Sequence, residues 1–177
     1  MIALNTQFIL LISGMVGAGK TTVGRKLKEK LSRVAVFDMD DIKWQISDFV
    51  RGDGDNAIVR DGVRSLTRNY CKHGISIVLP QTLRPEEPAQ FRKIAEEFGY
   101  KFLHIELFTD DETAMRRVLA RQKSSPNPPS PRSRVERNIA WYHEHRVDDS
   151  SVERIDTSNL SIDEVVEMVE RRLTEFV

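Results

Sequence analysis

The sequence GMVGAGKT, residues 14–21, decides the fold of this 177-residue chain. It fits the pattern G-x-x-x-x-G-K-[ST], in which glycines let the backbone turn so that successive N–H groups point at a chain of phosphates. Apolar residues 8–13 precede it as a strand, and residues 20–31 follow with helical spacing, their apolar stripe formed by Val23, Leu27 and Leu31. A strand, a glycine-rich turn and a helix in this order predict a phosphate-binding loop (P-loop).

The residues of this loop have separate expected roles. Lys20 is expected to bridge the β- and γ-phosphates of a bound nucleotide, and Thr21 to bind Mg²⁺ through its hydroxyl. The helix that begins at Lys20 adds the positive end of its dipole. A glycine-rich turn without a ligand is the alternative interpretation. The expected nucleotide-binding residues of the loop are Gly14, Gly17, Ala18, Gly19, Lys20, Thr21 and Thr22.

Apolar runs of strand length alternate with helical segments along the rest of the chain. This alternation is typical of a parallel sheet whose strands are joined by helical crossovers. We expect an α/β, three-layer P-loop NTPase fold, with a five-stranded parallel sheet, helices on both faces and one domain over residues 1–177. The expected strands are residues 8–13, 35–37, 75–79, 102–107 and 152–156.

Two further helices have clear start and stop signals. Ser161 followed by Glu164 predicts a capping box at the start of the last helix. Between Pro85 and Gly99, a proline and two acids precede an apolar stripe that ends at the glycine, which is the asymmetry that helix termini favour.

Composition narrows the class of protein. The 27 basic and 27 acidic residues give a net charge of zero, which argues against a surface built to coat nucleic acid. Cys71 is the single cysteine, so no disulfide forms within the chain. The apolar runs are far shorter than the roughly 20 residues that cross a bilayer. We expect a cytoplasmic protein that does not bind membranes, and the sequence says nothing of its oligomeric state.

Three carboxylates follow the second predicted strand. The carboxyl ends of parallel strands border the ligand, and an extended segment would place Asp38 and Asp40 on one side. Phosphoryl transfer to a hydroxyl needs one carboxylate to accept the proton, and the metal often needs another. We therefore expect Asp40 in the cleft and Asp38 with Thr21 at the metal, whereas Asp41 is expected to cap the next helix.

A lid is expected near residues 121–137. A predicted helix over residues 111–122 carries Arg117 and Arg121 on one face and leads into residues 124–133, which are rich in proline and serine. We interpret residues 124–133 as a mobile flap. Arginines that a closing lid delivers can stabilise the charge on a transferred phosphoryl group.

These features together resemble the small P-loop kinases that phosphorylate hydroxyl groups. That branch includes gluconate and shikimate kinases, chloramphenicol phosphotransferase, zeta-toxin-like kinases and polynucleotide 5′-kinases. The resemblance rests on residues 14–21, on the run Asp38-x-Asp40-Asp41 and on Lys43, and it covers nearly the whole chain. It implies ATP and Mg²⁺ as cofactors, Asp40 as the base on the substrate side, Arg117 on the adenine and Arg121 on the phosphates. The catalytic residues that we expect are Lys20, Asp40 and Arg121.

The chain departs from these relatives after its third predicted strand. It carries Leu79-Pro80-Gln81-Thr82 where shikimate kinases have a glycine triplet and where many relatives have an aspartate. Arg60 and Arg64, four residues apart on the preceding helix, could together hold an anionic substrate. Ordinary surface roles are the alternative for Arg60, Arg64 and Gln81. The expected acceptor-binding residues are Asp40, Lys43, Arg60, Arg64 and Gln81.

We therefore expect a kinase that transfers the γ-phosphate of ATP to a hydroxyl group of a small molecule. A polynucleotide 5′-hydroxyl kinase is an alternative that the run from Asp40 to Lys43 suggests and that the zero net charge disfavours. A nucleotide-binding regulator or simple NTPase without an acceptor is a second alternative, which gives Asp40 and the arginine pair no role. The sequence does not identify the acceptor.

Overall fold

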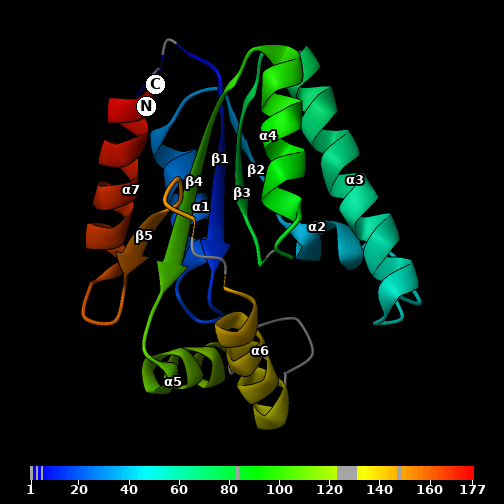
Figure 1. Cartoon of the computed structure of the whole chain (residues 1–177), viewed down its shortest axis with the longest axis vertical. Coiled ribbons are helices and arrows are strands. Elements are labelled where there is room, and N and C mark those ends of the chain that lie inside the picture. The colour runs from blue at the N-terminus through cyan, green and yellow to red at the C-terminus, as the bar shows by residue number, and fades with distance from the viewer. Residues whose placement is uncertain (1, 3, 5, 83, 123–130, 147–148) are drawn as a thin grey trace.

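Five parallel strands form one sheet in the order β2-β3-β1-β4-β5 (Figure 1). The computed structural model describes all residues except 1, 3, 5, 83, 123–130 and 147–148. The predicted α/β class and parallel sheet are confirmed, and each strand lies within two residues of its predicted bounds. The strands are β1 Phe8–Gly14, β2 Val34–Val36, β3 Ser76–Pro80, β4 Lys101–Phe108 and β5 Glu153–Asp156.

Helices cover both faces of the sheet and its lower end (Figure 1). Helices α1 and α7 lie on one face, α3 and α4 on the other, and α5 and α6 lie beyond the carboxyl ends of β1 and β4. In the described part of the chain, no helix is both long and apolar enough to span a bilayer. The helices are α1 Lys20–Lys30, α2 Met39–Lys43, α3 Asp53–Lys72, α4 Glu87–Phe98, α5 Asp111–Gln122, α6 Arg132–His145 and α7 Ile162–Phe176.

Strand β1 is buried on both faces along its whole length. Leu10 and Ile12 pack in the core beneath α1 and α7, whereas Ile9 and Leu11 pack in the core beneath α3 and α4. A central parallel strand reads as a continuous apolar run for this reason. The sheet therefore holds the P-loop at the end of its most deeply buried strand.

The predicted helix termini are confirmed at both marked places. Ser161 and Glu164 form a capping box at the start of α7, and Gly99 ends α4 in a left-handed conformation with φ of 70°. The predicted flap, residues 124–133, extends too far at its C-terminal end. Helix α6 begins at Arg132 after Pro131, a residue that is tolerated just before a helix, and residues 124–130 lie outside the described residues.

A buried histidine sits in the middle of the sheet. His104 of β4 is 7% exposed, and its Nε2 lies 2.6 Å from the hydroxyl oxygen of Ser13 on β1. Burial lowers the pKa of His104 to about 4 from the ordinary value of 6.5. The folded protein therefore keeps this imidazole neutral where an unfolded chain would begin to protonate it.

This depressed pKa predicts a loss of stability in mild acid. Between about pH 6.5 and pH 4 the unfolded chain binds a proton that the folded chain does not, so the free energy of unfolding should fall by up to about 3 kcal/mol as the pH drops. Urea unfolding at several pH values measures this slope. His104→Gln should reduce the slope, and His73→Gln, at an exposed position, should not. An equal slope in wild type and His104→Gln would show that other groups cause the acid sensitivity.

Candidate functional site

The P-loop is held against β4 and α5 by close backbone contacts. Gly14 and Gly17 have φ of 118° and 81°, a region that side chains rarely adopt. A Cβ at Gly14 would lie 2.0 Å from the carbonyl oxygen of Leu107, and one at Gly17 would lie 2.7 Å from that of Ala114. Both positions therefore need glycine for space as well as for conformation, which fixes the path of the loop.

Lys20 lies buried inside this loop. Its side chain folds back so that Nζ donates to the carbonyl oxygens of Gly14 at 2.9 Å and Met15 at 2.7 Å. Burial and the nearby guanidinium of Arg121 lower the pKa of Lys20 to about 8, although the carboxylate of Asp38 acts in the opposite direction. A desolvated cation that donates to two carbonyl oxygens is well prepared to bind phosphate oxygens.

Thr21 and Asp38 come together at the start of α1 and α2. The hydroxyl of Thr21 lies 3.4 Å from Oδ2 of Asp38. Oδ1 of Asp38 accepts from the backbone N–H of Asp40 at 2.7 Å and of Asp41 at 3.2 Å, which leaves Oδ2 facing Thr21. Burial and the neighbouring carboxylates of Asp41 and Asp40 raise the pKa of Asp38, so a cation beside it would be favourable.

This oxygen pair fits Mg²⁺ bound together with phosphates. The described residues contain no group of three or more His, Cys, Asp or Glu that could hold a metal by themselves. Mg²⁺ usually keeps several waters and takes only one or two protein oxygens in addition to those of a nucleotide. Thr21 and Asp38 supply that number.

The carboxylates after β2 are arranged differently from the prediction. Helix α2 begins at Met39, so Asp40 is helical, and Asp38 and Asp40 do not share one side of an extended segment. The predicted N-cap, Asp41, was also wrong. Asp38 is the N-cap, and Asp41 completes the capping box by accepting from the Asp38 N–H at 2.8 Å. The run D-x-D-D can form a box only in this register.

Asp40 projects from the first turn of α2 toward solvent. Its side chain is 58% exposed and pairs with Nζ of Lys43, one turn further along the helix. Thr22 is also exposed, on the first turn of α1, whereas Ala18 is buried in the P-loop. An exposed carboxylate two residues after Asp38 is open to a ligand from solvent.

Both predicted lid arginines lie on the P-loop side of α5. Arg117 donates to the hydroxyl oxygen of Thr157 at 3.1 Å and to its carbonyl oxygen at 2.8 Å. The same hydroxyl lies 3.0 Å from the carbonyl oxygen of Phe108 and 3.4 Å from that of Ala18 in the P-loop. Arg117 therefore joins α5 to the loop after β5 and, through it, to the P-loop. Arg121 is exposed and lies near enough to Lys20 to lower its pKa.

Arg60 and Arg64, which were predicted to hold an anionic substrate together, are each paired with a carboxylate of this chain. Nε of Arg60 lies 3.2 Å from Oε1 of Glu87, and Arg64 pairs with Asp61 and donates to Gln90 at 2.9 Å. Each arginine on α3 therefore has its own carboxylate. Gln81, which follows β3, is 4% exposed rather than lying in a surface loop.

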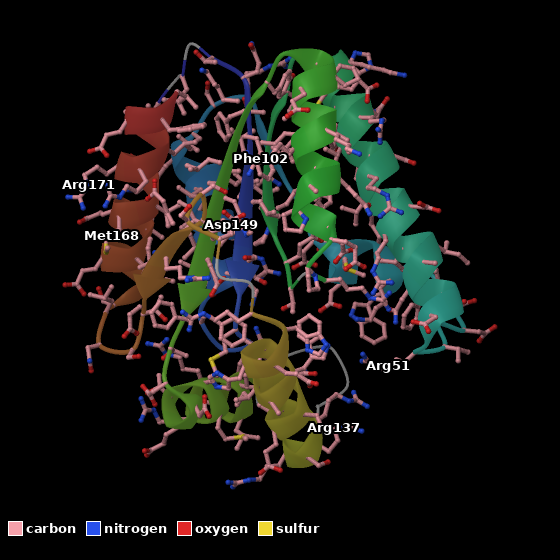
Figure 2. All side chains as sticks on the ribbon, in the orientation of Figure 1. Arg51, Phe102, Arg137, Asp149, Met168 and Arg171 are labelled. Carbon is pink, nitrogen blue, oxygen red and sulfur yellow. The ribbon has the colours of Figure 1, made fainter. Side chains whose placement is uncertain are left out.

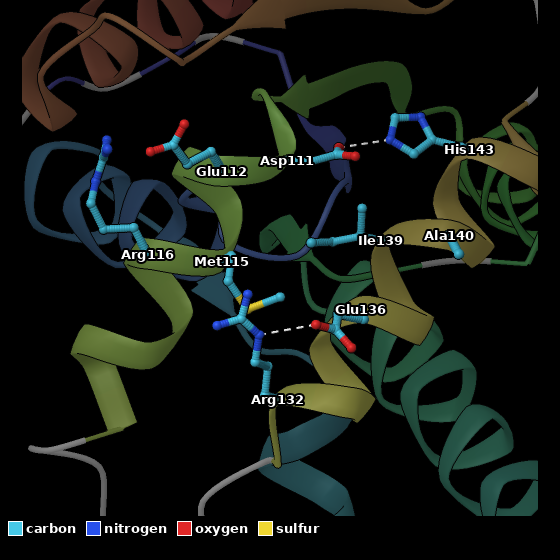
Figure 3. A pocket seen from close by; sticks show the side chains of 9 residues that line it. All are labelled: Asp111, Glu112, Met115, Arg116, Arg132, Glu136, Ile139, Ala140 and His143. Atoms are coloured by element: carbon cyan, nitrogen blue, oxygen red, sulfur yellow. Dashed lines mark hydrogen bonds and ion pairs between the residues drawn. The ribbon is translucent and has the colours of Figure 1, made fainter.

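A cavity of about 740 Å³ lies between α5 and α6 (Figure 3). A hydrogen bond between Asp111 and His143 at 2.8 Å and an ion pair between Arg132 and Glu136 at 3.0 Å border it. At 100° per residue, Met115 and Arg116 face a different side of α5 from Arg117 and Arg121. This cavity therefore lies apart from the loop and its arginines. Its lining residues are Asp111, Glu112, Met115, Arg116, Arg132, Glu136, Ile139, Ala140 and His143.

A row of polar residues across three strands was missed by sequence reasoning. Ser13, Glu106 and Arg154 lie side by side on β1, β4 and β5. Glu106 is 7% exposed, accepts from the Tyr142 hydroxyl of α6, and has Nε of Arg154 3.6 Å away. Burial and Glu106 raise the pKa of Tyr142. The sequence did carry a signal for this row. His104 and Glu106 are polar residues at alternate positions of a strand that was expected to be buried on both faces.

The pKa of Lys20 predicts how nucleotide binding depends on pH. As the pH rises through about 8, the free protein loses the charge that attracts phosphates, so affinity for an ATP analogue should decline. Lys20→Arg stays charged and should flatten this dependence, whereas Lys28→Arg, exposed on α1, should not. Titration of a fluorescent ATP analogue at several pH values measures the affinity of each variant. Equal wild-type affinity on both sides of this range would contradict the prediction.

A family model described as an AAA domain, AAA_33, matches residues 9–145. An adenylyl-sulfate kinase of Myxococcus xanthus is 33% identical over 106 residues, which is 55% of this chain and 56% of that protein. The match thus spans about half the length of this curated relative.

Solved structures share the fold along nearly the whole chain. A putative kinase from Chloroflexus aurantiacus has a TM-score of 0.70 and 15% identity, covering 97% of this chain and 98% of that one. A sugar kinase from Janibacter has a TM-score of 0.67 and 15% sequence identity, and the match covers 94% of each chain. The APS kinase of Mycobacterium tuberculosis, in complex with AMPPNP and APS, has a TM-score of 0.65 and 22% sequence identity. The match covers 95% of this chain and 98% of that one.

Proposed function

Because the chain belongs to the AAA domain family AAA_33, we propose that it transfers the γ-phosphate of ATP to a hydroxyl group of a small molecule. The observation that carries this proposal is the contact between Thr21 and Asp38 beside the buried Lys20, with Asp40 following on α2. A phosphate-binding cation, a pair of metal-binding oxygens and an exposed carboxylate are the parts that such a transfer requires. The similarity to an adenylyl-sulfate kinase supports the same reaction class.

The P-loop and the helix ends bind the triphosphate. Lys20 leaves the carbonyls of Gly14 and Met15 and bonds the β- and γ-phosphates, while backbone N–H groups of the loop hold the rest. Mg²⁺, held by Thr21 and Asp38, would neutralise charge on the phosphate oxygens. Arg117 of α5 contacts the loop after β5, where it would border the adenine, and Arg121 stabilises charge on the γ-phosphoryl group.

Asp40 receives the proton of the acceptor. The hydroxyl oxygen forms a bond to the γ-phosphorus as the bond from that phosphorus to the bridging oxygen of ADP breaks, and the hydroxyl proton passes to a carboxylate oxygen of Asp40. The ion pair with Lys43 orients Asp40 before transfer. Residues 121–137 are proposed as the lid that excludes water. Within this lid, residues 123–130 lie outside the described residues.

A cluster of cations and aromatic rings beside Asp40 favours a second acceptor. Nζ of Lys43 lies 4.9 Å from the ring centre of Trp44 and 5.5 Å from that of Phe49, and the Arg51 guanidinium lies 5.6 Å from Trp44. Figure 2 shows Arg51 beyond the lower end of α3, at the end of the molecule where α5 and α6 lie. Aromatic rings with cations are typical of surfaces that bind single-stranded nucleic acid, so a polynucleotide 5′-hydroxyl kinase is the second candidate.

The substitution Asp40→Asn tests the proposed function. An amide cannot accept the proton, so transfer should fall by about 10²- to 10⁴-fold while ATP affinity stays within about twofold. Transfer is measured with γ-labelled ATP and Mg²⁺ against sugars, polyols, nucleosides, adenylyl sulfate and 5′-hydroxyl oligonucleotides, with Lys20→Ala as the blank.

Asp48→Asn is the matched control because Asp48 is an exposed carboxylate in the segment after α2. It should retain wild-type transfer. Label that appears only as free phosphate, at the same rate in Asp40→Asn, would indicate an NTPase without an acceptor. Label on oligonucleotides alone would select the second candidate.

A further inference from the structure

All three polar groups of Thr157, the residue directly after β5, are hydrogen-bonded, and its side chain is buried at 1% exposure. Its backbone N–H donates to the carbonyl oxygen of Phe108 at 2.8 Å. Its hydroxyl oxygen and its carbonyl oxygen accept from the two terminal nitrogens of Arg117, at 3.1 Å and 2.8 Å. One buried residue therefore supplies two acceptors to a single guanidinium.

The loop that carries Thr157 is bonded to its neighbours on two sides. The backbone N–H of Asp110 donates to the hydroxyl oxygen of Ser158 at 3.0 Å, and Asp110 accepts from the N–H of Thr113 in the first turn of α5. The hydroxyl of Thr157 lies 3.4 Å from the carbonyl oxygen of Ala18 in the P-loop. The guanidinium that Thr157 holds is thus fixed relative to both α5 and the P-loop.

The base of a nucleotide in the P-loop would lie on the Thr157 side. The sheet order places β2 and β5 at opposite edges, with β1 and its P-loop between them. The oxygen pair of Thr21 and Asp38, which fits Mg²⁺ on the outer phosphates, lies toward β2 because Asp38 follows that strand. The other end of the nucleotide, which carries the base, would therefore point toward the carboxyl ends of β4 and β5.

The bonds to Thr157 determine which part of Arg117 a ligand meets. All N–H bonds of a guanidinium lie in its plane, so two bonds along its edge fix the direction of that plane. The flat face is left for contact with a ring, and arginine stacks well on aromatic rings through this face. Arg117 is half-buried, so it is still within reach of solvent.

We propose that Thr157 is a positioning residue for nucleotide binding. Its hydroxyl and carbonyl hold Arg117 so that the face of the guanidinium stacks on the base, and Thr157 acts only through that arginine. This inference rests on the proposed function, because it takes the ligand of the P-loop to be ATP.

The substitution Thr157→Val tests this role, since it keeps the branched shape and removes the hydroxyl. Affinity for a ribose-labelled fluorescent ATP analogue should fall by about 3- to 10-fold, because one remaining bond lets the guanidinium turn away from the base. Thr157→Ser restores the hydroxyl and should restore the affinity. Tripolyphosphate with Mg²⁺, which has no base, should displace the analogue from the P-loop with the same inhibition constant in Thr157→Val as in wild type.

Thr113→Val is the matched control, because the buried hydroxyl of Thr113 also accepts from an arginine, Arg116, at 3.1 Å. It should leave the affinity for the ATP analogue unchanged. Arg117→Ala should weaken binding of the analogue at least as much as Thr157→Val, and adding Thr157→Val to it should have no further effect. Urea unfolding of each variant identifies any loss of fold. If Thr157→Val does not fold, Arg117→Ala decides alone, and it must weaken the analogue and spare tripolyphosphate.

The outcomes separate this inference from the function on which it rests. Unchanged affinity in Thr157→Val, an equal loss for tripolyphosphate, or a further loss in the Arg117→Ala background overturns the positioning role and leaves the kinase intact. The expected pattern of affinities without transfer to any acceptor supports the positioning role and overturns the kinase. Failure of the wild-type protein to bind the ATP analogue overturns both.

Discussion

The approach of the Gly14 backbone to the end of β4 is the constraint on which this structure depends. The Gly14 α-carbon is so close to the Leu107 carbonyl that no side chain fits, and Met15 N–H donates to that same carbonyl at 3.0 Å. The turn therefore starts from a rigid, buried strand and is bounded by β4 and α5. A loop confined in this way holds its N–H groups in place before a ligand arrives, which reduces the entropy lost on binding.

The electrostatics of the site follow from burial at that loop. Lys20 is buried away from water and is repelled by the positive charge of Arg121. The negative charge of a triphosphate would relieve this repulsion. Asp38 is a half-buried carboxylate that is repelled by the negative charges of Asp41 and Asp40, and its pKa is raised. A cation between Asp38 and the phosphates would offset both kinds of repulsion. These are the charges that the proposed binding of a nucleotide with its metal would offset.

Sequence patterns predicted the fold well because its signals are local. The apolar runs, the glycines of the loop, Gly99 and the Ser161–Glu164 box each act within a few residues, and α5 was predicted with its observed bounds. The position of Asp40 could not be predicted from spacing, because the capping box at Asp38 starts a helix one residue after it.

Long-range pairings in the site were also beyond the sequence. The carboxylates that compensate Arg60 and Arg64 include Glu87, which lies 27 positions from Arg60 and is brought to it only by the packing of α3 on α4. The burial of Gln81 and the row of Ser13, Glu106 and Arg154 depend on strand register in the same way. Residues that meet across elements show no periodicity along the chain, so only the tertiary structure reveals their partners.

The bond between Tyr142 and Glu106 is one of several anchors along α6. Val135 and Ile139, two turns and one turn before Tyr142, are buried in the same core. A helix anchored by a buried stripe along its length moves as one rigid body. Any displacement of α6 would therefore have to break the bond to Glu106 and expose Val135 and Ile139 together.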